Sequence, residues 1–281
     1  MKKYFIIDFD STFTNVEALD LLGEISLAAS NEKSERLEKI KEITDHGMDG
    51  GMSFRESLVK RLELLDARKE HLHHLVEKLK ARISKSFHRN EEFFRKHTDQ
   101  IYILSNGFKE FIVPIVTEYG VKPNHVYANT FKFDEQERIV GFDEDNILSR
   151  NNGKAKQIER LKLKGEVSVI GDGYTDYEIK EAGFASKFYA FTENVSRDKV
   201  LQKADHVAPS LDEVLYMNKL NTAISYPKNR IKVLLLENVH PMAEKILKEE
   251  GYQVEIHAGG MDEEELVERV KDVSILGIRS K

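Results

Sequence analysis

Two aspartates, Asp8 and Asp10, stand one residue apart directly after the apolar run Tyr4–Ile7. At an effective dielectric constant of about 20, two carboxylates about 4 Å apart repel each other by roughly 4 kcal/mol. A divalent cation offsets such repulsion, and a chain that offers oxygen ligands and no cysteine favours Mg²⁺. The pair therefore predicts metal-assisted carboxylate chemistry at the end of a strand.

Three further polar patches carry side chains that suit phosphoryl transfer. They are Ser105-Asn106-Gly107 after the apolar run 101–104, Lys154 in the stretch NNGK, and Asp172 and Asp176 in GDGYTD after the apolar run 167–170. An aspartate can attack phosphorus to form an aspartyl-phosphate, and a second aspartate two residues on can protonate the leaving oxygen and later deprotonate the attacking water. A lysine, a hydroxyl and a glycine amide can cradle the equatorial oxygens of the transition state.

Each of these patches is commonplace when it occurs alone. An isolated Asp-x-Asp, a serine after a strand or a lysine at a helix start usually has no catalytic role. In this chain all of them occur together, and those at Asp8, Ser105 and Asp172 directly follow expected strands. The combination therefore predicts a catalytic site.

Short apolar runs alternate with amphipathic helical patterns along the chain. The expected strands are Tyr4–Phe9, Ile101–Ser105, Val126–Phe131, Val167–Gly171 and Phe188–Phe191. This alternation predicts an α/β fold with a Rossmann-like parallel sheet core, which binds ligands at the carboxyl ends of its strands. Residues 16–97 contain no convincing strand and show leucines at helical spacing, so we expect a helical cap inserted after the first strand.

A second α/β pattern begins after the stretch YPKNR at residues 226–230. Its expected elements are a strand in IKVLLLENV, a helix from about Pro241, a strand Gln253–Ile256, a helix Asp262–Val270 and a strand Val273–Gly277. About 50 residues of this kind could hardly bury both faces of a parallel sheet alone. We therefore expect a partial C-terminal α/β unit over residues 229–281 that packs on the first domain or on a partner, or that belongs to a truncated chain.

Composition narrows the classes of partner. The 281 residues carry a net charge of −6, which gives no reason to expect a nucleic-acid or membrane partner. The chain has no cysteine, which excludes disulfides and thiolate catalysis. No apolar run approaches the length of a membrane span, and Asp8 and Asp10 cut the N-terminal apolar stretch too short for a signal peptide. We expect a cytoplasmic protein whose partner is a small phosphorylated substrate, with a homodimer as an option.

The motifs DFDST, LSNG, NNGK and GDGYTD resemble the four motifs of the haloacid dehalogenase-like hydrolase superfamily, over roughly residues 1–215. The second aspartate favours the phosphatases of that superfamily over its dehalogenases, which lack this acid. The resemblance implies a phosphatase domain over residues 1–225, with Asp8 as the nucleophile and Asp10 as the general acid and then base.

The same resemblance implies a ligand set for Mg²⁺. Asp8, the backbone carbonyl of Asp10, and Asp172 would hold the metal. Asp176 would either orient Lys154 or complete the metal shell. The residues implied for phosphate binding are Ser105, Asn106, Gly107 and Lys154.

Within the superfamily the chain is most similar to the phosphoserine phosphatase family, and the similarity extends into the cap. Glu17 would bind the amino group of the substrate, and Arg61 would bind its carboxylate. Met48 and Phe54 would close over the site. Opposite charges placed apart suit a zwitterion, and arginine binds a carboxylate through two parallel hydrogen bonds. The resemblance thus implies hydrolysis of O-phospho-L-serine to L-serine and phosphate.

Two departures from that family leave the substrate open. Asn106 and Thr175 stand where the family usually has a glycine and an asparagine. A phosphatase of the same fold that acts on another small metabolite phosphate is therefore an alternative.

The tail, about residues 229–281, resembles the beginning of D-3-phosphoglycerate dehydrogenase, whose Arg-Ser pair is matched by Arg279 and Ser280. The nucleotide-binding glycine motif of that enzyme is absent, so the chain is not expected to be a working dehydrogenase. Because both enzymes belong to serine biosynthesis, the tail suggests a bifunctional fusion seen in part. A third interpretation makes the first domain a regulatory or structural partner of a dehydrogenase.

Overall fold

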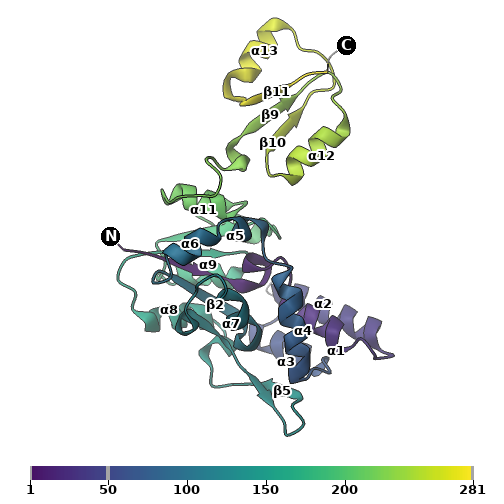
Figure 1. The fold of residues 1–281 in the computed structure, drawn as a ribbon, viewed down its shortest axis with the longest axis vertical. Helices are drawn as coiled ribbons and strands as arrows, with labels where there is room; N and C mark the ends of the chain where they lie inside the picture. The colour runs from purple at the N-terminus through teal and green to yellow at the C-terminus, as the bar shows by residue number, and fades with distance from the viewer. Residues whose placement is uncertain (1, 49–50, 280–281) are drawn as a thin grey trace. The chain divides into compact units, whose positions relative to one another are not determined.

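The computed structural model describes residues 2–48 and 51–279 of the chain (Figure 1). Its packing divides into two compact units, residues 1–208 and 209–281. The division precedes the expected linker at residues 226–230, because helix α11 (Leu211–Met217) packs with the second unit. The domain limits expected from the sequence, 1–225 and 229–281, stay a prediction.

A six-stranded sheet forms the middle of the first unit. Its strand order is β3-β2-β1-β6-β7-β8, and every neighbouring pair is parallel. β1 is almost wholly buried, as expected for a parallel sheet that is covered on both faces. The predicted α/β fold with a parallel sheet core is confirmed. The strands are β1 (Lys3–Ile7), β2 (Ile101–Phe108), β3 (Val126–Asn129), β6 (Glu166–Gly171), β7 (Lys187–Phe191) and β8 (His206–Ala208), of which β8 adds to the five expected.

The strand order explains why motifs far apart in the sequence meet. β1 lies between β2 and β6, and its last residue Ile7 is level with Ile103 on one side and Ile170 on the other. The chain therefore emerges from all three strands at one edge of the sheet. Asp8 follows β1 at that edge, Asp172 follows β6, and Ser105 lies in β2 just beyond the paired positions.

Helices fill the connections between the strands. Beyond β2 these are α7 (Lys109–Val116), α8 (Gly153–Leu161), α9 (Tyr174–Glu181) and α10 (Asp198–Leu201), with the short helices η2 (Pro123–His125) and η3 (Ile147–Ser149). No helix in the described residues 2–48 and 51–279 is both long enough and apolar enough to cross a bilayer.

The cap occupies the long connection between β1 and β2, whose described residues form helices and no strand, as expected. Figure 1 shows α1 to α4 grouped together. The two segments that join the cap to the sheet are themselves paired, since the amide of Asn15 donates to the carbonyl of Arg82 (2.8 Å) and that of Ser84 donates to the carbonyl of Phe13 (3.0 Å). The helices of the cap are α1 (Ala18–Ser26), α2 (Lys33–Met48), α3 (Phe54–Glu63) and α4 (Lys69–Lys80). The short helices α5 (Lys85–Arg89) and α6 (Glu91–Lys96) follow the second crossing segment and lead back to β2, so the cap ends before the expected limit at residue 97.

The expected strand Val126–Phe131 is wrong at its end, because β3 stops at Asn129. Phe131 instead begins β4 (Phe131–Phe133), which forms an antiparallel hairpin with β5 (Ile139–Phe142). The hairpin contacts the cap through its backbone. The amide of Ile139 donates to the carbonyl of Ala67 (2.8 Å), and the amide of Lys69 donates to the carbonyl of Glu137 (3.0 Å). The cap is therefore attached at the hairpin as well as at its two crossing segments.

A cluster of aromatic rings supports the turn after β1. The ring of Phe13, which is fully buried, lies with its centroid 5.2 Å from those of Phe87 and Tyr119 and 5.6 Å from that of Phe94. Phe9 stacks on Phe13 from within the same turn, at 5.9 Å. Because these rings come from the turn, the cap's return segment and the connection after β2, their burial fixes the turn to the sheet unit.

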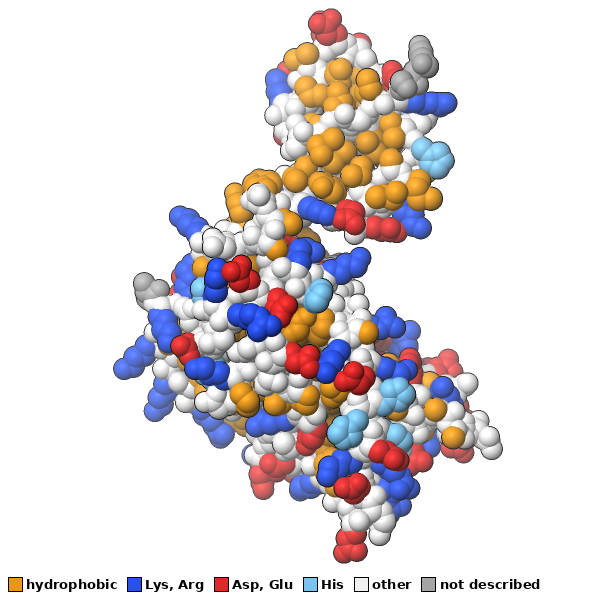
Figure 2. All heavy atoms as spheres, in the orientation of Figure 1, with side chains coloured by type: hydrophobic (Ala, Val, Ile, Leu, Met, Phe, Trp, Pro, Cys, Tyr) orange, Lys and Arg blue, Asp and Glu red, His pale blue; other side chains and the backbone are white. Residues whose placement is uncertain are grey.

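The second unit holds a three-stranded parallel sheet of order β10-β9-β11. Its central strand is buried, whereas Ile275 and Leu276, which face opposite sides of the edge strand β11, are each 44% exposed. Figure 2 shows apolar side chains at the surface of this unit. The sheet is thus open on both faces at one edge, as expected for a partial α/β unit. Besides α11, its elements are η4 (Lys228–Arg230), β9 (Lys232–Leu235), α12 (Pro241–Glu249), β10 (Gln253–Ile256), α13 (Glu263–Arg269), η5 (Val270–Asp272) and β11 (Ile275–Gly277).

Candidate active site

The two N-terminal aspartates are brought to the site by a turn, which corrects the expected strand Tyr4–Phe9. β1 ends at Ile7, and an irregular turn, η1 (Phe9–Phe13), follows it, in which the backbone angles of Asp10 and Ser11 are not helical. Asp8 begins this turn by accepting a hydrogen bond from the amide of Phe9 (2.7 Å). Asp10 accepts from the amide of Ala18 (2.8 Å), at the start of the first cap helix. The pair therefore does not share one face of a strand, and Asp10 is placed by the start of the cap.

Asp8 meets the two aspartates of the GDGYTD motif at the edge of the sheet. Carboxylate oxygens of Asp8, Asp172 and Asp176 all lie within 4.8 Å of one another. Three converging carboxylates with oxygen donors only form a set that could hold a hard divalent cation. The side chain of Asp10 does not belong to this group, and a ligand role for its backbone carbonyl stays a prediction.

Lys154 lies inside the acidic cluster. Its ammonium is 2.9 Å from Oδ1 of Asp8 and 2.8 Å from Oδ1 of Asp176, and the residue is 2% exposed. Burial works to lower the pKa of Lys154, but the charges of Asp176 and Asp8 outweigh burial and raise the pKa above its ordinary value. The lysine is therefore held in its charged form beside the predicted nucleophile.

The glycines on either side of Asp172 make room for the Asp176 carboxylate. It accepts a hydrogen bond from the amide of Gly173 (3.2 Å). A Cβ on Gly171 would lie 2.2 Å from the carboxyl carbon of Asp176, so no larger residue fits there. Of the two roles expected for Asp176, orientation of Lys154 corresponds to a contact in the structure, and a place in the metal shell stays a prediction.

Two residues that the motif analysis missed hold Asp172. The hydroxyl of Thr12 donates to its Oδ1 (3.1 Å), and the guanidinium of Arg197 lies 3.2 Å from its Oδ2. Burial and the neighbouring charge of Asp8 raise the pKa of Asp172 to about 6, while Arg197 acts to lower it. Thr12 closes the DFDST motif, but its contact with Asp172 was not expected, and Arg197 has no distinctive sequence signal, because only the fold brings the two residues to Asp172.

The expected phosphate-binding residues 105–107 lie against Asp10, in the part of β2 where its register with β3 shifts. The hydroxyl oxygen of Ser105 accepts from the amide of Gly107 (2.9 Å). A Cβ on Gly107 would lie 2.9 Å from Oδ2 of Asp10 and 3.1 Å from Oγ of Ser105, so the glycine permits this close approach. Asn129, at the end of β3, donates to the carbonyl of Asn106 (2.8 Å) and fixes the middle of this segment.

Asp10 is placed to carry a proton. Burial is the main cause that raises the pKa of Asp10 well above its ordinary value, and the charge of Glu17 adds to it. The hydrogen bond from Ala18 acts in the opposite direction. A carboxyl group in such surroundings favours its protonated form and can act as a general acid.

The structure also brings Glu17 and Arg61 to this region. Glu17 accepts from the hydroxyl of Ser11 (2.7 Å), and burial with the charge of Asp172 raises its pKa to about 7. Arg61 is 7% exposed, and its charge acts to lower the pKa of both Glu17 and Asp10. A cation and a carboxyl group of the cap therefore lie within electrostatic range of the predicted acid.

The guanidinium of Arg61 is held from one side. Its Nη1 donates to the hydroxyl of Thr44 (3.3 Å), which donates to Asp20 (3.0 Å). Its Nε is buried and has no hydrogen-bond partner among residues 2–48 and 51–279. Arg61 therefore retains hydrogen-bonding capacity for a bound anion.

The structure gives less support for the expected lid roles of Phe54 and Met48. Phe54 begins α3 and is half-buried. The side chain of Met48 lies outside the described part of the chain. The lid roles of both residues stay predictions, as does the match of Ser280, which also lies outside the described residues.

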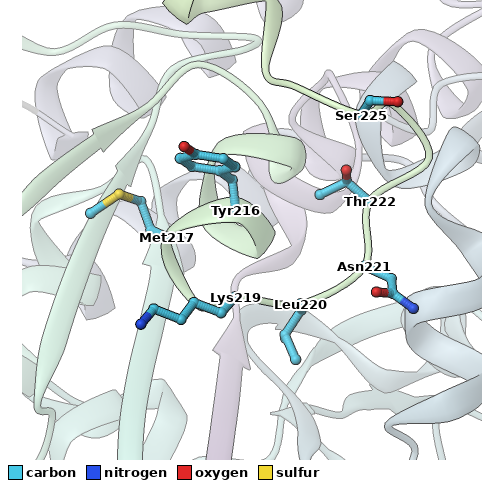
Figure 3. Close-up of a pocket in the computed structure, with 7 residues that line it drawn as sticks. All are labelled: Tyr216, Met217, Lys219, Leu220, Asn221, Thr222 and Ser225. Atoms are coloured by element: carbon cyan, nitrogen blue, oxygen red, sulfur yellow. The ribbon is translucent and has the colours of Figure 1, made fainter.

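A separate hollow lies in the second unit and is shown in Figure 3. It is lined by residues of α11 and the loop that follows, namely Tyr216, Met217, Lys219, Leu220, Asn221, Thr222 and Ser225. This lining contains no carboxylate, so it offers none of the acid chemistry of the sheet edge.

Comparison with known proteins fits this geometry. The chain matches the haloacid dehalogenase-like hydrolase family over residues 5–181, more than half of its length, and it belongs to that family. A chloroplastic phosphoserine phosphatase of Arabidopsis thaliana is 29% identical over 201 residues, which are 70% of this chain and 65% of that protein. The crystal structure of a phosphoserine phosphohydrolase-like protein from Francisella tularensis is 30% identical, with a TM-score of 0.69, and the match covers 77% of this chain and 99% of that one. These relatives support an enzyme of the phosphatase class.

A shorter match concerns a different kind of enzyme. D-3-phosphoglycerate dehydrogenase of Dictyostelium discoideum is 45% identical over 62 residues, which are 22% of this chain and 15% of that protein. The match agrees with the resemblance of the tail to the beginning of that enzyme.

Removal of the buried ammonium should destabilise the sheet edge. In Lys154→Met, Asp8 and Asp176 lose the cation between them, and we expect the free energy of unfolding to fall by about 3–5 kcal/mol. Urea denaturation in the presence of a chelator measures the change. The control is Lys156→Met, an exposed position on the same helix, where we expect a change of about 0.5 kcal/mol or less. Equal denaturation midpoints for the two variants would contradict this account.

The raised pKa of Glu17 predicts a dependence of stability on pH. Its ordinary value is 4.5 and its folded value about 7, so between these pH values the folded chain keeps a proton that the unfolded chain has released. The free energy of unfolding should therefore fall as the pH rises through this window, and the fall should be smaller in Glu17→Gln. Urea denaturation of metal-free protein across the window tests this, with Glu24→Gln, an exposed position on α1, as the control. Identical pH profiles for the wild type and Glu17→Gln would refute it.

Proposed function

We propose that this protein is a Mg²⁺-dependent phosphatase that hydrolyses O-phospho-L-serine to L-serine and phosphate in serine biosynthesis. The observation that supports phosphoserine as the substrate is the placement of Arg61 and Glu17. They supply a cation and a carboxyl group from the cap near Asp10, and the buried Nε of Arg61 has no partner in the part of the chain that the structure describes. A substrate with a carboxylate, an amino group and a phosphate has a matching charge for each part of this site.

The acidic group supports Mg²⁺ as the metal. Asp8, Asp172 and the backbone carbonyl of Asp10 would hold it, with Asp176 paired to Lys154. Bound there, the ion would neutralise charge on the phosphate oxygens and on the nucleophile. Oxygen ligands from carboxylates are the set that Mg²⁺ prefers.

Asp8 is the proposed nucleophile. Its carboxylate attacks phosphorus, a bond from oxygen to phosphorus forms, and the bond from phosphorus to the serine oxygen breaks. Asp10 gives its proton to that departing oxygen, which leaves as the hydroxyl of serine. Water then attacks the phosphorus of the aspartyl-phosphate, Asp10 takes the proton from the water, and the carboxylate of Asp8 is released together with phosphate.

The groups around the phosphate stabilise the charge that develops in both steps. Lys154 is already charged and fixed at 2.9 Å from Asp8, so it needs no rearrangement to meet the phosphoryl oxygens. The hydroxyl of Ser105, whose oxygen accepts from the amide of Gly107, offers a further donor beside Asp10. A contact between the Gly107 amide and the phosphate stays a prediction. Phe54 and Met48 would exclude water when the cap is closed.

A phosphatase of the same fold with another small phosphometabolite as substrate is the second candidate. Asn106 and Thr175, the two departures from the family's usual residues, favour it. We retain the prediction of a cytoplasmic enzyme without nucleic-acid or membrane partners. A fusion with a dehydrogenase and a homodimer also stay predictions.

A panel of phosphometabolites assayed with and without Mg²⁺ separates the candidates. We expect the highest kcat/KM for O-phospho-L-serine and loss of phosphate release when a chelator is present. A higher kcat/KM for another phosphate ester would identify that ester as the substrate in place of phosphoserine. Absence of phosphate release from every ester would favour a regulatory role for the domain.

Asp8→Asn tests the nucleophile. The amide cannot form the acyl-phosphate, so we expect turnover to fall by about 10⁴-fold or more, since nucleophile and acid act as one unit. The isosteric change should leave the far-ultraviolet circular dichroism spectrum unchanged. Residual turnover within about tenfold of the wild type would remove Asp8 from this role.

Arg61→Ala tests the selectivity. We expect the KM for phosphoserine to rise by about 10²-fold, because a buried charged hydrogen bond to the substrate carboxylate is lost. The KM for an aryl phosphate without a carboxylate should change little. The control is Arg55→Ala, on the same helix, whose guanidinium pairs with Glu144 at the surface. An equal rise of KM for both substrates in Arg61→Ala would remove the argument for an amino-acid substrate.

A further inference from the structure

The side chain of Asn194 joins two segments that lie far apart in the sequence. It lies in the loop after β7, outside the cap and outside the four motifs. Its Nδ2 donates to the carbonyl of Ser11 (3.0 Å) and to the hydroxyl oxygen of Ser84 (2.7 Å). The carbonyls of Thr14 and Thr12 lie 3.4 and 3.5 Å from the same nitrogen. One amide group is thus surrounded by four acceptors.

The first of these segments is the turn at residues 10–14, which places reacting groups. Ser11 has a φ of 54°, a left-handed conformation that is unfavourable for a serine and needs support from its surroundings. The hydroxyl of Ser11 donates to Glu17, and that of Thr12 donates to Asp172. A shift of this turn would therefore move Asp10 and disturb both of those carboxylates.

The second segment is the return of the cap at residues 82–86. The hydroxyl of Ser84 donates to the carbonyl of Thr12 (2.6 Å) while it accepts from Asn194. A chain of hydrogen bonds thus runs from Asn194 through Ser84 to Thr12. The neighbouring Glu193 accepts from the amide of Ser86 (2.9 Å) and from its hydroxyl. Residues 193 and 194 together hold the return segment against the loop after β7.

We propose that Asn194 is a positioning residue that fixes the turn of Asp10 and the return segment of the cap together. Only a donor of two hydrogens can satisfy both Ser11 and Ser84 from one point. An aspartate at this position would have the same shape, but it could not donate these hydrogen bonds, and its carboxylate oxygen would face the carbonyl oxygen of Ser11. Asn194→Asp therefore loosens both segments without removing any group that touches the substrate.

Hydrogen exchange measured by mass spectrometry tests the joint restraint without reference to any substrate. In Asn194→Asp we expect exchange to become about tenfold faster or more in peptides that cover residues 10–16 and 82–86, with β6 unchanged. The control is Asn124→Asp, an exposed asparagine, which should leave all three regions as in the wild type. Unchanged exchange in either segment of Asn194→Asp would overturn the proposal. If that variant does not fold, Ser84→Ala, which breaks the same chain of hydrogen bonds, must accelerate exchange in both segments.

A kinetic test rests on the proposed function and separates positioning from general loosening. p-Nitrophenolate leaves without a proton, so formation of the phospho-enzyme from p-nitrophenyl phosphate needs Asp10 less than formation from phosphoserine does. In single-turnover measurements we expect Asn194→Asp to slow the release of serine by about tenfold or more, and the burst of p-nitrophenolate by about threefold or less. Equal slowing of both would show that the turn of Asp10 is not what Asn194 positions. If phosphoserine proves not to be a substrate, the exchange test still decides the proposal.

Discussion

The arrangement of the site depends on the buried ammonium of Lys154, which lies 2.9 Å from Asp8 and 2.8 Å from Asp176. Without a cation, buried carboxylates this close together would repel one another and favour protonation. Lys154 reduces that repulsion both at Asp8, the predicted nucleophile, and at Asp176, the aspartate that orients the lysine. Since the strand order puts Asp8 and the GDGYTD motif on adjacent strands, the sheet brings the acids together and the helix α8 supplies the charge that makes their proximity tolerable.

A second level of organisation works through the turn after β1. The turn is held by the packing of the Phe13 ring and by the hydrogen bond from Asn194 to the carbonyl of Ser11. The hydroxyls of Ser11 and Thr12, in the same turn, donate to Glu17 and Asp172. The first cap helix begins at Ala18, whose amide binds Asp10. Asp10, the predicted acid, therefore lies in the turn after a sheet strand and is also hydrogen-bonded to the first cap helix. A movement of the cap would for this reason shift the carboxyl group that donates the proton.

The sequence was sufficient for the sheet core, the helical insertion and the clustering of Asp8, Lys154, Asp172 and Asp176, because each motif stands beside a strong apolar or helical pattern. It was misleading at Phe9, where an apolar residue after β1 extends the strand pattern although the backbone already turns. β8, only three residues long, and the hairpin β4–β5 were missed because their pairing is set by neighbours in space. Thr12, Arg197 and Asn194 could not be found from the sequence, since a threonine, an arginine or an asparagine in a loop acquires a role only from the groups that the fold places beside it.

The hairpin β4–β5 gives the cap a second point of attachment to the sheet unit. Together with the paired crossing segments, its backbone hydrogen bonds to Ala67 and Lys69 attach the cap at points far apart along the chain. A body held along a line can rotate about that line but cannot swing freely in every direction. Opening of the cap for the proposed substrate should therefore follow a single axis, so that each closure returns the cap to the same register over the sheet edge.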